Sequence, residues 1–221
     1  EYSGNIASAR LAYDRASQDF LTLSSAMMVG RFYTRNDEFK KATDIFSHIQ
    51  ATKPHMNGSY NALQNAHAGT AMDKKITSLN KGLSVALYDF ASFLYEQKGY
   101  EGALIYARIA DYLSPNQPEI QLILGDLMVV FRHYDEAKKL YTSIPRTADN
   151  YVMAQVRLSE AYERHYDYDG ALAALLPLID DYSHDVGLLT RLGDISRRSG
   201  NNKQAIDFYN RVELTLHPEK D

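Results

Sequence analysis

An alanine recurs in this sequence at a constant step, and this step limits the available folds more than any other feature. The four alanines are Ala103, Ala137, Ala171 and Ala205. A fixed period of this length, about 34 residues, is typical of repeat proteins in which each repeat forms one small supersecondary unit. A single unit cannot bury its own apolar face, so neighbouring units have to stack.

Apolar residues within the repeats recur at helical spacing. The segments QLILGDLMVVF (121–131) and ALAALLPLIDDY (171–182) place apolar side chains at positions i, i+3, i+4 and i+7. The sequence shows no convincing pair of alternating segments around an Asn-Gly or Asp-Gly turn. We therefore predict an all-α fold.

Other positions of the repeat are as regular as the alanine. We count four units, at 84–117, 118–151, 152–185 and 186–219, so that the alanine takes position 20. Position 8 is always small: Ala91, Gly125, Ser159 and Gly193. Positions 7, 11, 24 and 27 are mostly large. Small residues at positions 8 and 20 allow two antiparallel helices to approach closely, and the large residues fill the seams within and between pairs.

This pattern resembles the tetratricopeptide repeat (TPR), a helix–turn–helix unit with the same period. The agreement includes a tyrosine at position 17 in three units: Tyr100, Tyr134 and Tyr168. The resemblance implies a right-handed superhelical solenoid of antiparallel helix pairs. The tryptophan common at position 4 of that family is missing, because the chain has no Trp. Pro145 and Pro177 come earlier than the family's closing proline, so we expect those second helices to end early or to kink.

The same pattern continues upstream, out of phase. Ala42 at position 20 and Gly30 at position 8 define another unit at 23–56. One step earlier, position 20 falls on Ser8, and we interpret residues 1–20 as the second helix of an incomplete unit. Its apolar residues would lack their natural partner helix: Leu11, Ala12 and Phe20. We therefore expect this chain to be a fragment of a longer array.

Ala42 and Ala103 are not separated by a whole number of repeat steps, so the repeat phase breaks between them. We assign the break to 57–83, a connector with a short helix near 60–67. The expected organisation is a half-repeat plus one unit at 1–56, the connector at 57–83, and four units at 84–219.

Composition disfavours several classes of function. The net charge of −4 argues against a nucleic-acid partner, which requires a basic face. No apolar run of about 18 residues is present, so we expect no direct membrane insertion. The sequence has no cysteine, phosphate-binding loop, catalytic grouping or histidine pair at ligand spacing. We expect no enzyme activity, no cofactor and no metal.

The chain is also similar, over most of its length, to the C-terminal half of alphaproteobacterial TPR proteins. That similarity implies a bacterial source and a larger parent protein, but no particular activity. It leaves a cytoplasmic and a periplasmic location equally open, and a sequence without cysteine suits both.

The resemblance to the TPR family also implies where a partner would bind. In that family, the first helix of each pair lines a concave wall through positions 2, 5, 9 and 12. Carried over to this sequence, these positions give a set of candidate partner-binding residues: Tyr88, Ser92, Tyr95, Leu122, Asp126, Val156, Glu160, Glu163, Asp194 and Arg197. The Lys-and-Asn clamp with which some members grip a peptide carboxylate is absent at these positions.

Position 9 forms an acidic row in three consecutive units: Asp126, Glu160 and Asp194. One interpretation is a groove for a protein or peptide segment with basic and apolar residues. The other is that these charges only keep an exposed wall in solution. For the chain as a whole, the leading hypothesis is an adaptor that binds a protein segment in its groove. The alternative is a structural role, with assembly into a homo-oligomer through the N-terminal helix.

Overall fold

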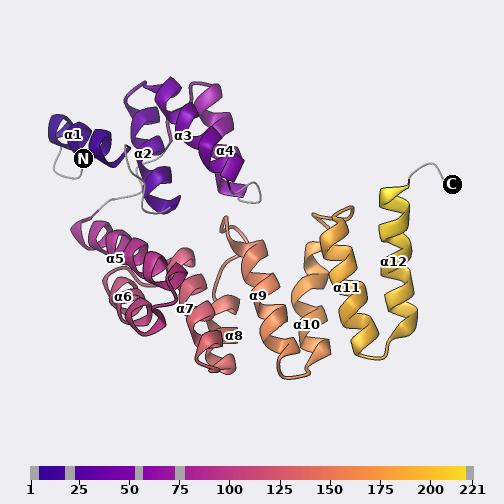
Figure 1. Ribbon diagram of the computed structural model, residues 1–221. Helices are drawn as coiled ribbons and strands as arrows, with labels where there is room; N and C mark the ends of the chain where they lie inside the picture. Colours follow the sequence, from indigo (N-terminus) through magenta and orange to yellow (C-terminus); the bar gives the residue numbers. More distant parts are fainter. Residues whose placement is uncertain (1–4, 18–22, 53–56, 73–77, 218–221) are drawn as a thin grey trace. The chain divides into compact units, whose positions relative to one another are not determined.

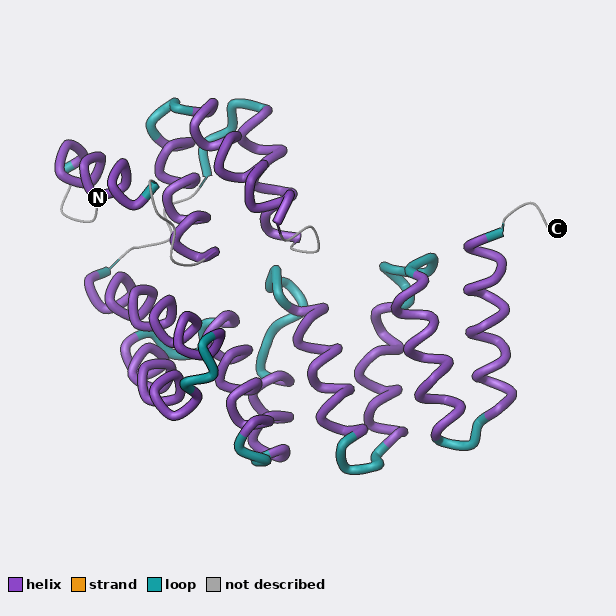
Figure 2. Tube along the Cα trace, viewed as in Figure 1, coloured by secondary structure: helices purple, strands orange, loops and turns teal. Residues whose placement is uncertain are grey.

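The computed structural model describes residues 5–17, 23–52, 57–72 and 78–217, and all regular structure in these segments is helical (Figure 1, Figure 2). The prediction of an all-α fold is thus confirmed. The chain divides into two compact units, Glu1–Ile123 and Leu124–Asp221, which we describe separately.

The helices follow one another in sequential pairs (Figure 1). The first unit contains six complete helices and the start of a seventh, which continues into the second unit: α1 (Ile6–Ala16), α2 (Leu23–Arg35), α3 (Phe39–Thr52), α4 (Asn57–His67), α5 (Leu79–Glu96), α6 (Tyr100–Leu113) and α7 (Pro118–Val130). The second unit continues with α8 (Tyr134–Thr142), α9 (Tyr151–Glu163), α10 (Tyr168–Leu175), the 3₁₀ turn η1 (Leu176–Leu178), α11 (Val186–Arg198) and α12 (Asn202–Leu216).

The recurring alanine is the fourth residue of each second helix, and its side chain is buried. The five such alanines are at most 3% exposed: Ala42, Ala103, Ala137, Ala171 and Ala205. In a close-packed interior, a larger side chain at these positions would have to displace its neighbours. The constant spacing of these alanines in the sequence therefore corresponds to one buried contact position in each second helix.

Position 8 of the first helix packs against position 24 of the second, and each glycine at position 8 faces an aromatic ring at position 24. A Cβ added to Gly125 would overlap the ring of Tyr141, and one added to Gly193 would overlap Tyr209. Gly30 stands in the same relation to Phe46. Where position 24 is a leucine, as at Leu175, position 8 is the larger Ser159.

In each described turn from a first to a second helix, the residue at position 15 has a left-handed backbone conformation. The residues differ in type but agree in φ, which lies between 58° and 84°: Asp37, Lys98, Arg132, Tyr166 and Gly200. The next N–H reaches back to the carbonyl of position 11, as from His133 to Met128 at 2.8 Å. A bond of this span is the Schellman ending of a helix.

Pro145 and Pro177 act as the sequence predicted. Helix α8 ends at Thr142, and α10 gives way at Leu175 to the 3₁₀ turn that contains Pro177. A proline removes an N–H and crowds the preceding turn, so neither helix continues through it.

At the N-terminus, the assignment of position 20 to Ser8 is wrong by one residue. The Asn5 side chain caps α1 by accepting a hydrogen bond from the Ser8 N–H, so Ala9 becomes the fourth residue of the helix. Ala9 is buried, whereas Ser8 is exposed. Leu11 and Ala12 are exposed on α1, and Phe20 lies outside the described residues.

The predicted connector contains the expected short helix, α4, which packs on α3. Its C-terminal boundary differs from the prediction, because residues 79–83 belong to α5. Ser78 caps that helix by accepting a hydrogen bond from the Lys81 N–H at 3.1 Å, so α5 begins more than one turn before residue 84.

The glycine and aromatic pairs at positions 8 and 24 yield a first prediction. Gly125→Ala should lower the free energy of unfolding by about 1–2 kcal/mol, since overpacking against Tyr141 outweighs the better helix propensity of alanine. Ser159→Ala is the matched control at position 8. The Ser159 hydroxyl is buried without a hydrogen-bond partner among the described residues, so its loss should not destabilise. Urea unfolding of both variants measures the difference, and equal effects would contradict the close packing of Gly125 on Tyr141.

The left-handed turns yield a second prediction. Tyr166 is 80% exposed with φ 58°, so Tyr166→Gly should stabilise the fold by about 0.5–1 kcal/mol by removing steric strain. Gly200→Ala, at the same repeat position, should destabilise by a similar amount. A Cβ at Gly200 would meet no atom within 4 Å, so conformation alone would account for that loss. Opposite shifts in melting temperature are expected, and shifts of the same sign would refute the assignment.

Candidate functional site

The ten predicted partner-binding residues all lie on first helices: α5, α7, α9 and α11. Nine are half-buried, and Arg197 is exposed. Tyr88, Ser92, Tyr95 and Leu122 belong to the first compact unit, and the other six belong to the second. We therefore describe two separate groups.

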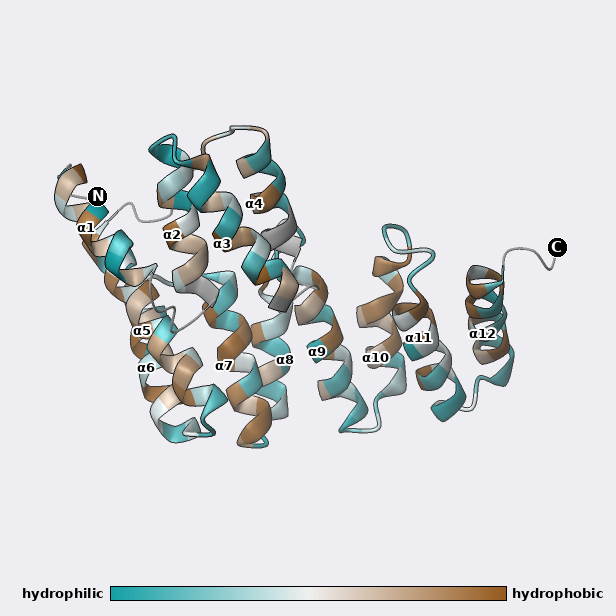
Figure 3. Ribbon diagram, turned by 45° about the horizontal axis from the view of Figure 1, so that its top comes forward, coloured by the Kyte–Doolittle hydropathy of each residue, from teal (hydrophilic) through white to brown (hydrophobic). Residues whose placement is uncertain are grey.

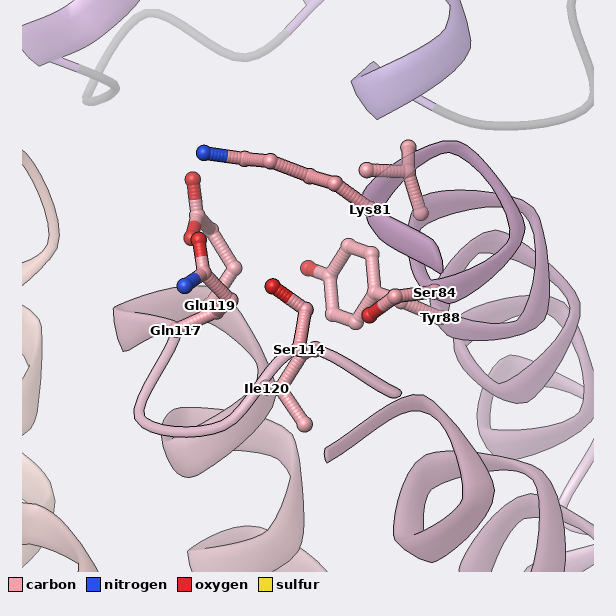
Figure 4. Close-up of a pocket in the computed structure, with 8 residues that line it drawn as sticks. Lys81, Ser84, Tyr88, Ser114, Gln117, Glu119 and Ile120 are labelled. Carbon is pink, nitrogen blue, oxygen red and sulfur yellow. The ribbon is translucent and has the colours of Figure 1, made fainter. Parts of the chain in front are cut away.

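In the first unit, Tyr88 lines a small surface hollow between α5 and the start of α7 (Figure 4). The hydroxyl groups of Tyr88 and Ser114 face the hollow, and the Lys81 side chain extends over it toward Glu119. Ser84 forms part of the lining, but its hydroxyl already donates to the Ala110 carbonyl at 2.7 Å. The hollow is therefore lined by both polar and apolar side chains.

Tyr95 lies further along α5, where its ring packs edge-on against Tyr100 with centroids 5.5 Å apart. Ser92 and Leu122 are half-buried on α5 and α7. The structure therefore brings Tyr88 into a concave feature and gives Tyr95 a packing role within its own helix pair.

In the second unit, two carboxylates of the acidic row are held by tyrosines. The Tyr141 hydroxyl donates to Asp126 at 2.7 Å, and the Tyr209 hydroxyl donates to Asp194 at 2.8 Å. These are the same two rings that pack against Gly125 and Gly193. A Gly-Asp pair in the first helix and a tyrosine at position 24 of the second helix thus form one motif, which occurs in two of the units.

Burial raises the pKa of Asp126 above its ordinary value of 3.8, and the neighbouring Glu160 carboxylate raises it further. The hydrogen bond from Tyr141 and the nearby Arg157 guanidinium act in the opposite direction. The Asp126 side chain is only 18% exposed, so it is better placed to support the wall than to meet a partner.

Arginines connect the carboxylates of neighbouring first helices. Arg157 of α9 lies 3.0 Å from Glu160 and 3.5 Å from Asp126. Arg191 of α11 lies 2.8 Å from Glu163 and 3.8 Å from Glu160, and Arg198 also pairs with Glu163. The side of α7, α9 and α11 that carries these residues, here called the first-helix wall, is therefore a network of ion pairs. Its carboxylates are not a row of unpaired negative charges.

Arg157 and Arg191 are not among the predicted residues, because the predicted residues occupy only positions 5, 9 and 12 of the repeat. Arg157 and Arg191 both occupy position 6, three residues before the acidic position 9, and this repetition is visible in the sequence. Pairs three residues apart share a helix face, so Arg157 and Glu160 could have been matched in advance.

Asp194 differs from the other carboxylates of the row. It accepts the Tyr209 hydrogen bond, and no cation of the described residues lies within ion-pair distance. Val156 and Arg197, the remaining predicted residues, lie on α9 and α11. Among the described residues, the Asp194 carboxylate is therefore oriented by Tyr209 alone.

Among the described residues, no three histidine, aspartate or glutamate side chains gather as metal ligands would. The helices described are all too short or too polar to cross a membrane.

The fold is similar to that of solved TPR proteins. The chain superposes on MamA 41-end from Desulfovibrio magneticus RS-1 with a TM-score of 0.57 and 15% identity, covering 99% of both chains. A MamA RS-1 double mutant gives a TM-score of 0.55 at 14% identity, with 87% of this chain and 93% of that chain covered. YrrB, a TPR protein with an unusual peptide-binding site, gives 0.53 at 10% identity, with 94% and 92% covered.

At such low identity these likenesses show the fold: a chain of helices in sequential pairs, as in TPR solenoids. By sequence, no family model and no curated protein matches the chain.

The raised pKa of Asp126 yields a third prediction. The folded state holds the proton to higher pH than the unfolded state, so Asp126 contributes stability below pH 3.8 that is lost as the pH rises through its raised pKa. Asp126→Asn keeps an acceptor for Tyr141 and does not titrate. The unfolding free energy of the wild type relative to Asp126→Asn should therefore fall as pH increases from 3.8. Urea titrations at several pH values test this, and parallel curves would contradict it.

Proposed function

We propose that this chain is a protein-binding module and that the first-helix wall of its second unit receives a segment of a partner protein. The observation that carries the proposal is the fixed carboxylate of Asp194, held by Tyr209 and left without a cation among the described residues. Glu160 lies in the neighbouring repeat with a side chain that is 37% exposed. Asp194 thus offers an oriented acceptor to a basic side chain, beside the ion-paired Glu160.

Preorganisation makes such a wall suited to binding. A side chain already held in one rotamer loses little entropy when a ligand arrives. Tyr209 holds Asp194, while Arg157 and Arg191 hold Glu160. Half-buried Val156 supplies an apolar surface on α9 beside these charges. A segment with basic and apolar residues matches this chemistry.

No catalytic role is part of this proposal. The polar groups of the wall are engaged with one another in ion pairs and tyrosine hydrogen bonds, an arrangement that serves recognition. Solved TPR folds such as that of YrrB, which has an unusual peptide-binding site, are consistent with a docking surface of this kind.

A comparison of two charge-matched variants tests the proposal. Glu160→Gln/Asp194→Asn removes two negative charges from the wall, and Asp169→Asn/Asp207→Asn removes two exposed charges from second helices. We expect a partner captured from bacterial lysate by the wild type to be retained by the second variant and bound at least roughly tenfold more weakly by the first. Equal retention by both variants, with both folded by circular dichroism, would exclude the wall as the binding site.

A further inference from the structure

Helix α5 carries an apolar stripe on the side away from Tyr88, and most of this stripe is exposed. Its large residues are Leu79, Leu83, Phe90 and Phe93, which are 73%, 50%, 43% and 38% exposed. They are spaced by three, four or seven residues and so share one side of the helix. Tyr88 lies about 160° around the axis from Phe90, so the stripe is distinct from the hollow that Tyr88 lines.

The repeat itself shows what normally covers this side of a first helix. Phe90 and Phe93 stand at the repeat positions of Leu192 and Ile195 in α11, which are fully buried. Those two residues share a core cluster with the preceding second helix and its 3₁₀ turn, through Ala171, Leu172, Leu175 and Leu178. The α5 stripe thus occupies the positions of an inter-repeat interface, and within the described part of the chain it is left largely exposed.

The ends of the helix stacks differ in a way that marks α5 as unusual. The outward side of α4 is polar, with Asn61, Gln64 and His67 exposed. The outward side of α12 is mixed, because it exposes Asn210 and Glu213 together with Ile206 and Leu214. Terminal helices of solenoids require such polar faces to stay in solution. Helix α5 begins a new stack after the phase break, yet its outward side is apolar.

Helix α6 extends the apolar surface. Ile105, Ile109 and Tyr112 are 59%, 42% and 85% exposed, whereas their counterparts in the next unit are Lys139, Ser143 and Arg146. Tyr106 of α6 packs edge-on against Phe90 at 4.7 Å and so connects the two helices. Hydrophobic residues occur on both helices in Figure 3. Exposed apolar patches on a protein surface mark interaction sites.

We propose that the α5 stripe docks an amphipathic helix of another protein, one that presents a leucine-rich face as α10 does to α11. The complementary face needs large apolar residues three or four apart, as in Leu172, Leu175 and Leu178–Ile179. Such a helix would give Phe90 and Phe93 the cover that Leu192 and Ile195 already have. The inference does not depend on the proposed function, which concerns α9 and α11 of the second unit.

The probe is a labelled peptide of residues 167–180, DYDGALAALLPLID, which contains α10. Ala173→Lys with a lactam bridge to Asp169 would fix the helix through two exposed positions spaced by four residues. Fluorescence anisotropy with the whole chain measures binding. Two double variants place charges on the stripe. The first is Leu83→Lys/Phe93→Lys. The second is Leu79→Lys/Leu83→Lys, which changes the two most exposed residues and so affects folding least. Ile206→Lys/Leu214→Lys, on exposed positions of α12, is the charge-matched control.

We expect saturable binding by the wild type and the control, and at least roughly tenfold weaker binding by both stripe variants. Absence of saturable binding by the wild type, or equal binding by folded stripe variants, overturns the proposal. Two further measurements test other ligands for the stripe. Sedimentation velocity tests for a second copy of the chain, and flotation with phosphatidylglycerol vesicles tests for a lipid surface. Self-association or vesicle binding that Leu79→Lys/Leu83→Lys abolishes would assign the stripe to a second copy of the chain or to a lipid surface instead, and would also overturn it.

Discussion

The contact between position 8 of a first helix and position 24 of the following second helix sets the geometry on which the rest of the structure depends. A glycine accepts an aromatic ring at Gly125 and Gly193, and a serine accepts the smaller Leu175. The same tyrosine that fills the seam donates its hydroxyl to the aspartate next to the glycine. Packing and side-chain orientation are therefore coupled, because one ring both separates the helices and fixes the carboxylate on the wall.

Charge on the wall follows the stacking of the repeats. A net charge of −4 and three acidic residues in a row suggest a negative groove, but Arg157 and Arg191 reach from one first helix to the carboxylates of its neighbours. These ion pairs stabilise by modest amounts at an exposed surface, yet they restrict the rotamers of the groups they join. Most carboxylates of these first helices are therefore paired with arginines, whereas Asp194 is held by a tyrosine hydrogen bond.

The break in the repeat phase changes the chemistry of the helices around it. Helix α4 ends one set of pairs with a polar outer side, whereas α5 starts the next with an apolar one. Within a uniform array, the residues at the positions of Phe90 and Phe93 are covered by the preceding second helix, as in α11. The loss of phase therefore leaves a repeat interface exposed, which is where the second binding surface is proposed.

The sequence alone determined the helical class, the repeat period, the buried alanines and the early ends of α8 and α10, because these follow from residue size and from the proline ring. It also placed all ten candidate residues on first helices. The tertiary structure decided what spacing does not encode. Ala9 replaces Ser8 because a cap at Asn5 sets the start of α1. Five different residue types occupy the left-handed position 15, so the residue type there does not predict its backbone conformation. The partners of Arg157, Arg191 and Arg198 depend on which helices lie within reach of a long side chain, and only packing in three dimensions fixes that.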